Sequence, residues 1–221
     1  MPTSSQSPRI ARAAPLASAV LALWLSAGAA LAGTATWSID TSKSRVVVNV
    51  FRAGALSPSL HDHAFVPEHW SGSLAFDPQA PEKSSVEVAL DAASLRDQQP
   101  KLSAKDRATV EQQVQSPRIL DAQRYPDIRF TSDRLEELQR VDAQHIKGVL
   151  VGSLELHGQK HPLRIPIEAR WNAQGLEATG SVSFLQSEFG IRPYKKLLGT
   201  IAVQDQVRVD LTIHASPSAA R

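Results

Sequence analysis

The sequence contains no cysteine, which excludes a disulfide framework and a thiolate metal site. It also contains no G-x-S-x-G motif, the sharp strand-to-helix turn that exposes a serine nucleophile in many hydrolases. Ser57 and Ser187 lie in expected turns, but neither belongs to such a motif. We therefore expect a binding or structural protein and predict that it is not an enzyme.

Net charge is the second property that the expected mature chain lacks. The full sequence carries 24 Lys and Arg residues against 22 Asp and Glu residues, with a pI near 9.0. Arg9 and Arg12 account for the difference, and both lie in the first 32 residues. Without that segment the two signs balance, so no basic patch for nucleic acid is predicted.

The first 32 residues have the pattern of a cleavable signal peptide. Arg9 and Arg12 form a positive n-region, residues 16–25 form an apolar h-region, and residues 30–32 form an A-x-A cleavage site. An uncleaved membrane anchor is the alternative, because about 18 mostly apolar residues can just span a bilayer. No later apolar run is as long. The pattern favours export to the periplasm and a soluble mature chain of 189 residues, the size of one domain.

Residues 146–171 carry the clearest strand pattern. Between 146 and 156 every second residue is Ile, Leu or Gly, and between 163 and 171 every second residue is Leu, Ile, Ala or Trp. Because successive side chains leave a strand on opposite sides, each segment is predicted to be a long, half-buried strand. Residues 158–160 are predicted as the hairpin loop, since Gly158 can adopt a φ that other residues resist.

The rest of the chain repeats this pattern in shorter runs. Further strands are expected at 34–40, 45–52, 60–66, 70–76, 85–90, 128–138, 176–186, 201–203 and 207–213. The last two are predicted to form a hairpin around Asp205 and Gln206. One helix is expected between Ser103 and Gln115, because Ser103 and Asp106 give a capping pattern. This many closely spaced strands with one helix indicate an all-β fold, either a sandwich or an up-and-down barrel.

Small residues on the apolar faces favour the barrel. They occupy positions where a filled core would prefer larger side chains: Gly148, Gly152, Ala169, Ala178 and Gly180. Such positions can leave space for a ligand inside a barrel. Strand glycines are also common at bulges and barrel corners, so this reading stays open beside the first.

Six short segments are spread along the whole expected mature chain. They are WSID at 37–40, HDH at 61–63, WSG with FD within 70–77, LDAQRYPDIRF at 120–130, LELHG at 154–158 and SEFGI at 187–191. Together, and in this order, they resemble the YceI-like family of exported lipid-binding proteins. The sequence differs from that family in a helical insertion at 98–118 and a basic GIRPYKK loop at 190–196.

The resemblance implies both a fold and a ligand. The fold would be a lipocalin-like antiparallel up-and-down β-barrel with one short covering helix, over residues 33–215, with a flexible tail at 216–221. The ligand would be a long apolar chain, a polyisoprenoid or an isoprenoid quinone-type lipid, held in the barrel by a periplasmic binding or carrier protein. No cofactor other than such a lipid is implied. The interior positions expected to contact the lipid are Leu150, Leu154, Leu156, Ile165, Ile167, Ala178, Gly180, Val182 and Phe184.

Polar residues near the expected barrel mouth are candidates for contact with a lipid head group: His61, His63, Arg192, Tyr194 and Lys195. His61 and His63 would project to the same side of a strand and could also chelate a metal, with His69 as a third ligand. A His-based metal-binding protein and a stress-related structural protein with an incidental cavity are therefore the alternatives. The expected partners are the apolar lipid and, transiently, a membrane or a membrane protein.

Overall fold

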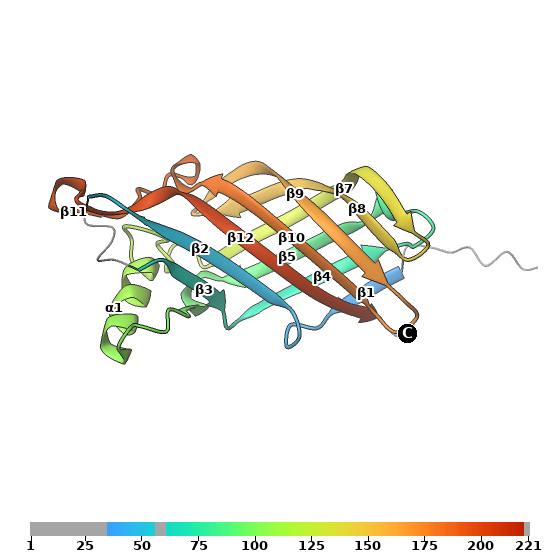
Figure 1. Cartoon of the computed structure of the whole chain (residues 1–221), viewed down its shortest axis with the longest axis horizontal. Helices are drawn as coiled ribbons and strands as arrows, with labels where there is room; N and C mark the ends of the chain where they lie inside the picture. Colours follow the sequence, from blue (N-terminus) through green and yellow to red (C-terminus); the bar gives the residue numbers. More distant parts are fainter. Residues whose placement is uncertain (1–34, 56–60, 219–221) are drawn as a thin grey trace, which may run out of the picture. The chain divides into compact units, whose positions relative to one another are not determined.

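The computed structural model describes residues 35–55 and 61–218 (Figure 1). The expected signal peptide at 1–32 lies outside these residues. The strands are β1 (Ala35–Ile39), β2 (Arg45–Ala53), β3 (His63–Pro67), β4 (Trp70–Phe76), β5 (Ser85–Asp91), β6 (Leu95–Asp97), β7 (Asp127–Asp142), β8 (His145–Leu156), β9 (Gln159–Trp171), β10 (Leu176–Leu185), β11 (Lys195–Lys196) and β12 (Ile201–Pro217). The helices are α1 (Ala104–Gln115) and the short 3-10 turns η2 (Pro81–Lys83), η3 (Ala92–Ser94), η4 (Gln186–Phe189) and η5 (Leu197–Gly199). No helix in the described part of the chain is long and apolar enough to cross a membrane.

Eight antiparallel strands close into a barrel, which confirms the predicted fold class. Hydrogen-bonded neighbours follow the order β1, β4, β5, β7, β8, β9, β10 and β12, and β12 pairs back to β1. The closing contact sets Ile39 of β1 opposite Ala215 of β12. Since a closed barrel leaves no unpaired sheet edge along these strands, its interior is separated from solvent by the wall itself.

Three of the barrel strands are continued by a second strand towards one end. β1 is followed by β2, and both pair with β12. β4 is preceded by β3 and β5 is followed by β6, so β2, β3 and β6 form the end of the wall there. β6 pairs with β3 on one side, and α1 lies against it. Figure 1 shows α1 at this end of the barrel, with β11 at the same end.

The alternation of β8 produces the wall expected from the sequence. Ile146, Leu154 and Leu156 are buried, whereas Lys147 and Glu155 are exposed. β9 and β10 continue the same face, because Ile165 lies opposite Leu150 and Ile167 lies opposite both Gly148 and Gly180. The apolar face of each strand therefore forms the inner surface of the barrel.

The predicted helix is confirmed, together with its cap. The Ser103 hydroxyl accepts a hydrogen bond from the Asp106 backbone N–H at 3.1 Å, and donates to the Asp106 carboxylate at 2.7 Å. The first of these bonds satisfies one of the backbone donors that the first turn leaves free, and the second fixes the Ser103 hydroxyl in place. Val110 and Val114 pack against the apolar side chains inside the barrel. The insertion therefore covers the interior at the point where β6 ends the wall.

Three sequence-based boundaries are wrong. The hairpin loop is His157-Gly158 rather than 158–160, with φ of 52° and 72°, and Leu156 pairs directly with Gln159. Two consecutive positive φ values suit a two-residue turn between twisted strands. The predicted hairpin around Asp205 does not form, because β12 runs unbroken from Ile201 to Pro217. The first two residues of the predicted tail belong to that strand.

A bulge explains the misread segment in β12. The register against β2 shifts between Val203 and Val207, opposite a strand that otherwise pairs continuously. The polar residues there bind η4: the Asp205 carboxylate accepts from the backbone N–H and the hydroxyl of Ser187, at 2.9 and 2.5 Å. Residues that look like a turn in the sequence therefore fasten one strand to a neighbouring segment.

Two of the strand glycines are required by close backbone contact, so they are not evidence for empty space. A Cβ on Gly152 would collide with the backbone of Thr131 and Ser132 on β7. A Cβ on Gly180 would lie 2.9 Å from the Pro166 carbonyl oxygen of β9. The alternative reading of these glycines, as sites of bulging and close approach, is the one that applies.

Candidate functional site

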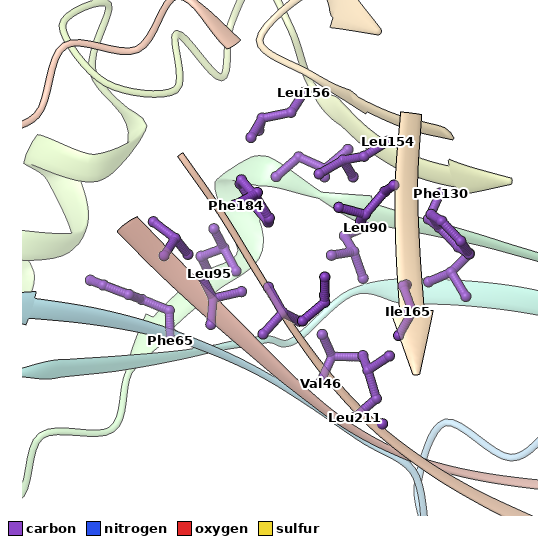
Figure 2. Close-up of a pocket in the computed structure, with 18 of the residues that line it drawn as sticks. Val46, Phe65, Leu90, Leu95, Phe130, Leu154, Leu156, Ile165, Phe184 and Leu211 are labelled. Atoms are coloured by element: carbon purple, nitrogen blue, oxygen red, sulfur yellow. The ribbon is translucent and has the colours of Figure 1, made fainter. Parts of the chain in front are cut away.

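The barrel encloses a cavity of about 520 Å³. Its wall consists almost entirely of aliphatic and aromatic side chains. Every barrel strand contributes side chains from its inner face. Figure 2 shows side chains such as Val46, Leu90 and Phe184 converging on this space from different strands. The volume falls within the range of about 300–1,000 Å³ that is usual for ligand sites. A cavity of this size and composition suits an apolar molecule.

The cavity extends along the barrel rather than across it. On β8 its lining residues run from Ile146 to Leu156. At about 3.3 Å per residue and a strand tilt of about 40°, this span corresponds to a length on the order of 25 Å. Because an eight-stranded barrel is only wide enough for one slender ligand, the space suits an extended chain better than a bulky ring system.

Aromatic side chains close one end of the cavity. The Phe76 ring packs edge-on against Trp37 and Trp171, with centroid separations of 5.6 and 5.0 Å. All three are buried, and the Trp37 indole N–H donates to the Phe76 carbonyl oxygen at 3.2 Å. Phe76 lines the cavity, whereas Trp37 and Trp171 lie behind it. This aromatic plug (Trp37, Phe76 and Trp171) therefore forms the floor.

The helical insertion supplies part of the wall at the opposite end. Leu102, Val110, Val114 and Leu120 come from α1 and its flanking segments and line the cavity. No residue of α1 is itself fully buried, so the helix depends on polar contacts to stay in place. The Arg107 guanidinium donates to the carbonyl oxygens of Asp97 and Gln99. α1 thus closes the gap beside β6 through a few hydrogen bonds and a thin apolar contact.

Polar side chains line the cavity at the α1 end, and we refer to five of them as the polar rim: Arg52, His61, His63, Gln113 and Tyr194. They come from β2, β3 and the segment before it, α1, and the segment before β11. The sheet register places the strands at one end, and α1 contacts β6 there. An amphipathic ligand could therefore place its tail against the aromatic plug and its polar group among these donors and acceptors.

His63 is oriented by a buried carboxylate that sequence analysis did not identify. Its Nδ1 lies 2.6 Å from Oδ2 of Asp97, whose side chain is completely buried. Oδ1 of Asp97 accepts from the Gln99 backbone N–H at 2.9 Å, and the Asp97 N–H donates to Glu111 of α1 at 2.9 Å. His63 is therefore part of the network that fastens α1 to β6. One ring face of His63 also stacks on Phe65.

Hydrogen bonds on the outer face of the barrel lower the pKa values of several carboxyl groups. A hydrogen bond from Arg164 lowers the pKa of Glu136, and one from His145 lowers the pKa of Glu168. The Ser42 hydroxyl lowers the pKa of Asp40 to about 2. None of these three carboxylates lines the cavity. The charges of these three carboxylates therefore lie outside the apolar interior.

Residues 37–215 match the model of the YceI-like domain. The chain belongs to the YceI-like domain family. Its curated relatives include a UPF0312 protein of Pseudomonas savastanoi pv. phaseolicola and one of Pseudomonas syringae pv. tomato. Each is 30% identical over 156 residues, which cover 71% of this chain and 71% of the relative.

Solved structures share the YceI-like fold. Burkholderia cenocepacia BcnA superposes with a TM-score of 0.63 at 20% identity, over 80% of this chain and 99% of that one. A polyisoprenoid binding domain from Saccharophagus degradans, implicated in plant cell wall breakdown, gives 0.60 at 11% identity, over 82% and 98%. The Campylobacter jejuni YCEI protein gives 0.53 at 18%, over 69% and 83%. At these identities the likeness concerns the fold alone.

The YceI-like barrel places all nine interior residues expected from the sequence on the cavity wall. Of the five head-group candidates, His61, His63 and Tyr194 line the cavity, whereas Arg192 and Lys195 are exposed and do not. Arg52 and Gln113 belong to the polar rim but were not among the residues expected there. Their spacing from apolar neighbours could have indicated them, because Arg52 ends an alternating strand and Gln113 lies on the same helical face as Val110.

The histidines do not form a three-ligand cluster. His69 is exposed, and its nearest acidic partner is Asp91 at 3.8 Å. The carboxylate of Asp62, which lies between His61 and His63 in the chain, accepts from the Arg52 backbone N–H at 2.9 Å. Within residues 35–55 and 61–218 no group of three His, Asp or Glu side chains is arranged to hold a metal ion.

Proposed function

We propose that this protein is a binding or carrier protein for one long apolar lipid, a polyisoprenoid or an isoprenoid quinone-type molecule, held along the barrel interior. The observation that carries the proposal is the cavity of about 520 Å³, closed by the aromatic plug and lined by apolar side chains up to the polar rim. The Saccharophagus degradans domain with the same fold is itself described as polyisoprenoid binding. This supports the ligand class.

The energetics favour a chain without a strong charge. Burying one methylene group contributes about 0.8 kcal/mol, so one isoprene unit contributes up to about 3 kcal/mol. A few units in the cavity therefore provide ample affinity without an ion pair. The polar rim would then select the orientation of the lipid and accept a hydroxyl, carbonyl or phosphate group at the α1 end.

We further propose that the carrier works in the periplasm and has no catalytic role. The N-terminal segment with its A-x-A site supports export. An aqueous compartment between two membranes is also where a long polyprenyl chain needs a protein to shield it from water. The hypothesis of a His-based metal protein receives no support from the arrangement of His61, His63 and His69.

A series of all-trans polyprenols of increasing length tests the lipid proposal. Affinity, measured by equilibrium partition of labelled polyprenol, should rise by between about tenfold and hundredfold for each added isoprene unit. The rise should stop once the chain fills the cavity. Equal affinity for short and long polyprenols, or no saturable binding, would show that the cavity is not the lipid site. Stoichiometric metal in the purified protein would instead favour the histidine hypothesis.

A further inference from the structure

Two leucines protrude into solvent beside the cavity mouth. Leu197 is 60% exposed and Leu198 is fully exposed, and both belong to η5, the turn between β11 and β12. Isolated exposed apolar residues are common. Two adjacent leucines at the tip of a turn instead form contiguous apolar surface, whose exposure to water is unfavourable. Figure 1 shows this turn beyond β11, at the end of the barrel that carries α1.

The turn holds these leucines outward in a backbone conformation that costs free energy. The φ values of Leu197 and Leu198 are 50° and 55°, in the left-handed region that disfavours residues with a branched bulky side chain. The Thr200 hydroxyl and backbone N–H both donate to the Leu197 carbonyl oxygen, at 2.8 and 3.2 Å. Strained positions that the surrounding structure fixes are often functional sites.

The tip is attached directly to the cavity wall. Lys196 pairs with Ile201 of β12, which lines the cavity, and Tyr194 of the polar rim lies three residues before Leu197. On the other side, the carbonyl oxygens of Gly199 and Thr200 approach Gly54 so closely that a Cβ there would lie 2.5 and 2.6 Å from them. The tip is therefore held against both β12 and the end of β2.

The charged residues of the chain segment that carries the tip have one sign. Between Phe189 and Gln204 the chain carries Arg192, Lys195 and Lys196 and no carboxylate. All three basic residues are exposed. Two exposed leucines that directly follow exposed basic residues in the chain match the boundary between the acyl region and the head groups of an anionic bilayer.

We propose that this membrane tip (Lys195, Lys196, Leu197 and Leu198) inserts into the surface of an anionic phospholipid bilayer and brings the cavity mouth to the membrane. The leucines enter the acyl boundary while the lysines bind lipid phosphates, each strengthening binding about fivefold. The polar rim then faces the bilayer, and a lipid tail can pass between membrane and cavity with little exposure to water. This role rests on the proposed lipid-carrier function.

The test uses protein expressed from the full-length coding sequence and purified without detergent. Flotation with vesicles of phosphatidylglycerol and phosphatidylcholine in equal parts measures the partition coefficient. The test variant is Leu197→Asn with Leu198→Asn, because asparagine is polar and tolerates positive φ, so folding is not at risk. The matched control is Val141→Asn, another exposed apolar residue, at the end of β7 near the aromatic plug.

The double variant should lose at least tenfold in partition coefficient, and the Val141 variant should bind like the unmodified protein. Lys195→Gln with Lys196→Gln should lose about 25-fold on these vesicles and little on pure phosphatidylcholine. Unchanged binding of the leucine variant, or no vesicle binding by the unmodified protein, would overturn the proposal.

A polyprenol titration of the same variants separates the two proposals. The leucine variant should bind dissolved geranylgeraniol as the unmodified protein does, and transfer from vesicles should slow. If geranylgeraniol does not bind but the leucine variant still loses vesicle binding, the lipid-carrier function is wrong and the membrane tip is supported. If geranylgeraniol binds and the leucine variant keeps its vesicle binding, the tip fails and the lipid function stands.

Discussion

Replacing Val182 by Phe should fill the middle of the cavity and separate the effects of binding from those of folding. Val182 lies on the inner face of β10, opposite Val209 of β12, and both residues line the cavity. Phe adds four carbon atoms in the direction of the empty space. We choose Phe rather than Trp, because an indole N–H in this apolar wall would have no acceptor.

In a hollow barrel, Val182→Phe should maintain or raise the stability of the ligand-free protein and lower its affinity for polyprenol. In a filled core, the larger side chain would overpack and cost about 1–3 kcal/mol. In a hollow barrel its added carbons become buried without displacing neighbours, so the ligand-free protein should be equally or more stable. Since about 1 kcal/mol shifts Tm by roughly 2–4 °C in a domain of this size, the two cases are distinguishable.

Lipid binding should fall sharply in the same variant. The barrel admits one slender chain, so a ring at its middle displaces at least one isoprene unit from the cavity. That displacement costs up to about 3 kcal/mol, or roughly a hundredfold in Kd. Thermal unfolding of the ligand-free protein and partition of labelled polyprenol are the two assays.

The matched control is Ser183→Phe, on the outer face of the same strand. It should leave Kd unchanged, because the added ring points away from the cavity. If the Val182→Phe protein melts several degrees lower yet binds polyprenol normally, the interior is packed and the lipid binds elsewhere.

Three further predictions concern the aromatic plug, the wall and the outer face. Phe76→Ala should lower the free energy of unfolding by about 3–5 kcal/mol, measured by denaturant titration, and should lengthen the polyprenol at which affinity stops rising. Gly152→Ala should cost about 1–3 kcal/mol, because its Cβ collides with the Thr131 backbone, and an unchanged Tm would contradict the assigned register. Glu168→Gln removes a carboxylate whose pKa is lowered by a hydrogen bond from His145. Its stabilisation is present above the unfolded pKa and lost as pH falls through the lower folded pKa, so the Tm difference from the unmodified protein should shrink in acid.

The alternation of apolar and polar side chains was enough to predict most of the strands and most of the cavity wall. Leu150, Ile165 and Val182 were assigned correctly to the interior because a barrel buries one face of every strand, and burial of one face is a period-2 signal in the sequence. The helix was equally readable, since Ser103 and Asp106 cap it through contacts only three residues apart.

Features that depend on distant partners could not be read in this way. Asp97 orients His63 across 34 residues of chain, and nothing local to a three-residue strand signals that contact. Asp205 looked like a turn residue, because its role depends on Ser187. Gly152 and Gly180 suggested empty space in the sequence. Glycine is instead required at both positions because the backbone of the neighbouring strand lies too close for a Cβ, and only the strand register determines that contact.

Native mass spectrometry of the protein purified from its own cells shows whether the barrel holds a lipid. We expect a complex with one lipid molecule per chain, which releases a polyisoprenoid or isoprenoid quinone-type compound on activation. The Val182→Phe protein, purified in parallel, should carry far less of it. A protein that is ligand-free under gentle conditions, with no difference between the two forms, would show that the barrel is not a lipid site.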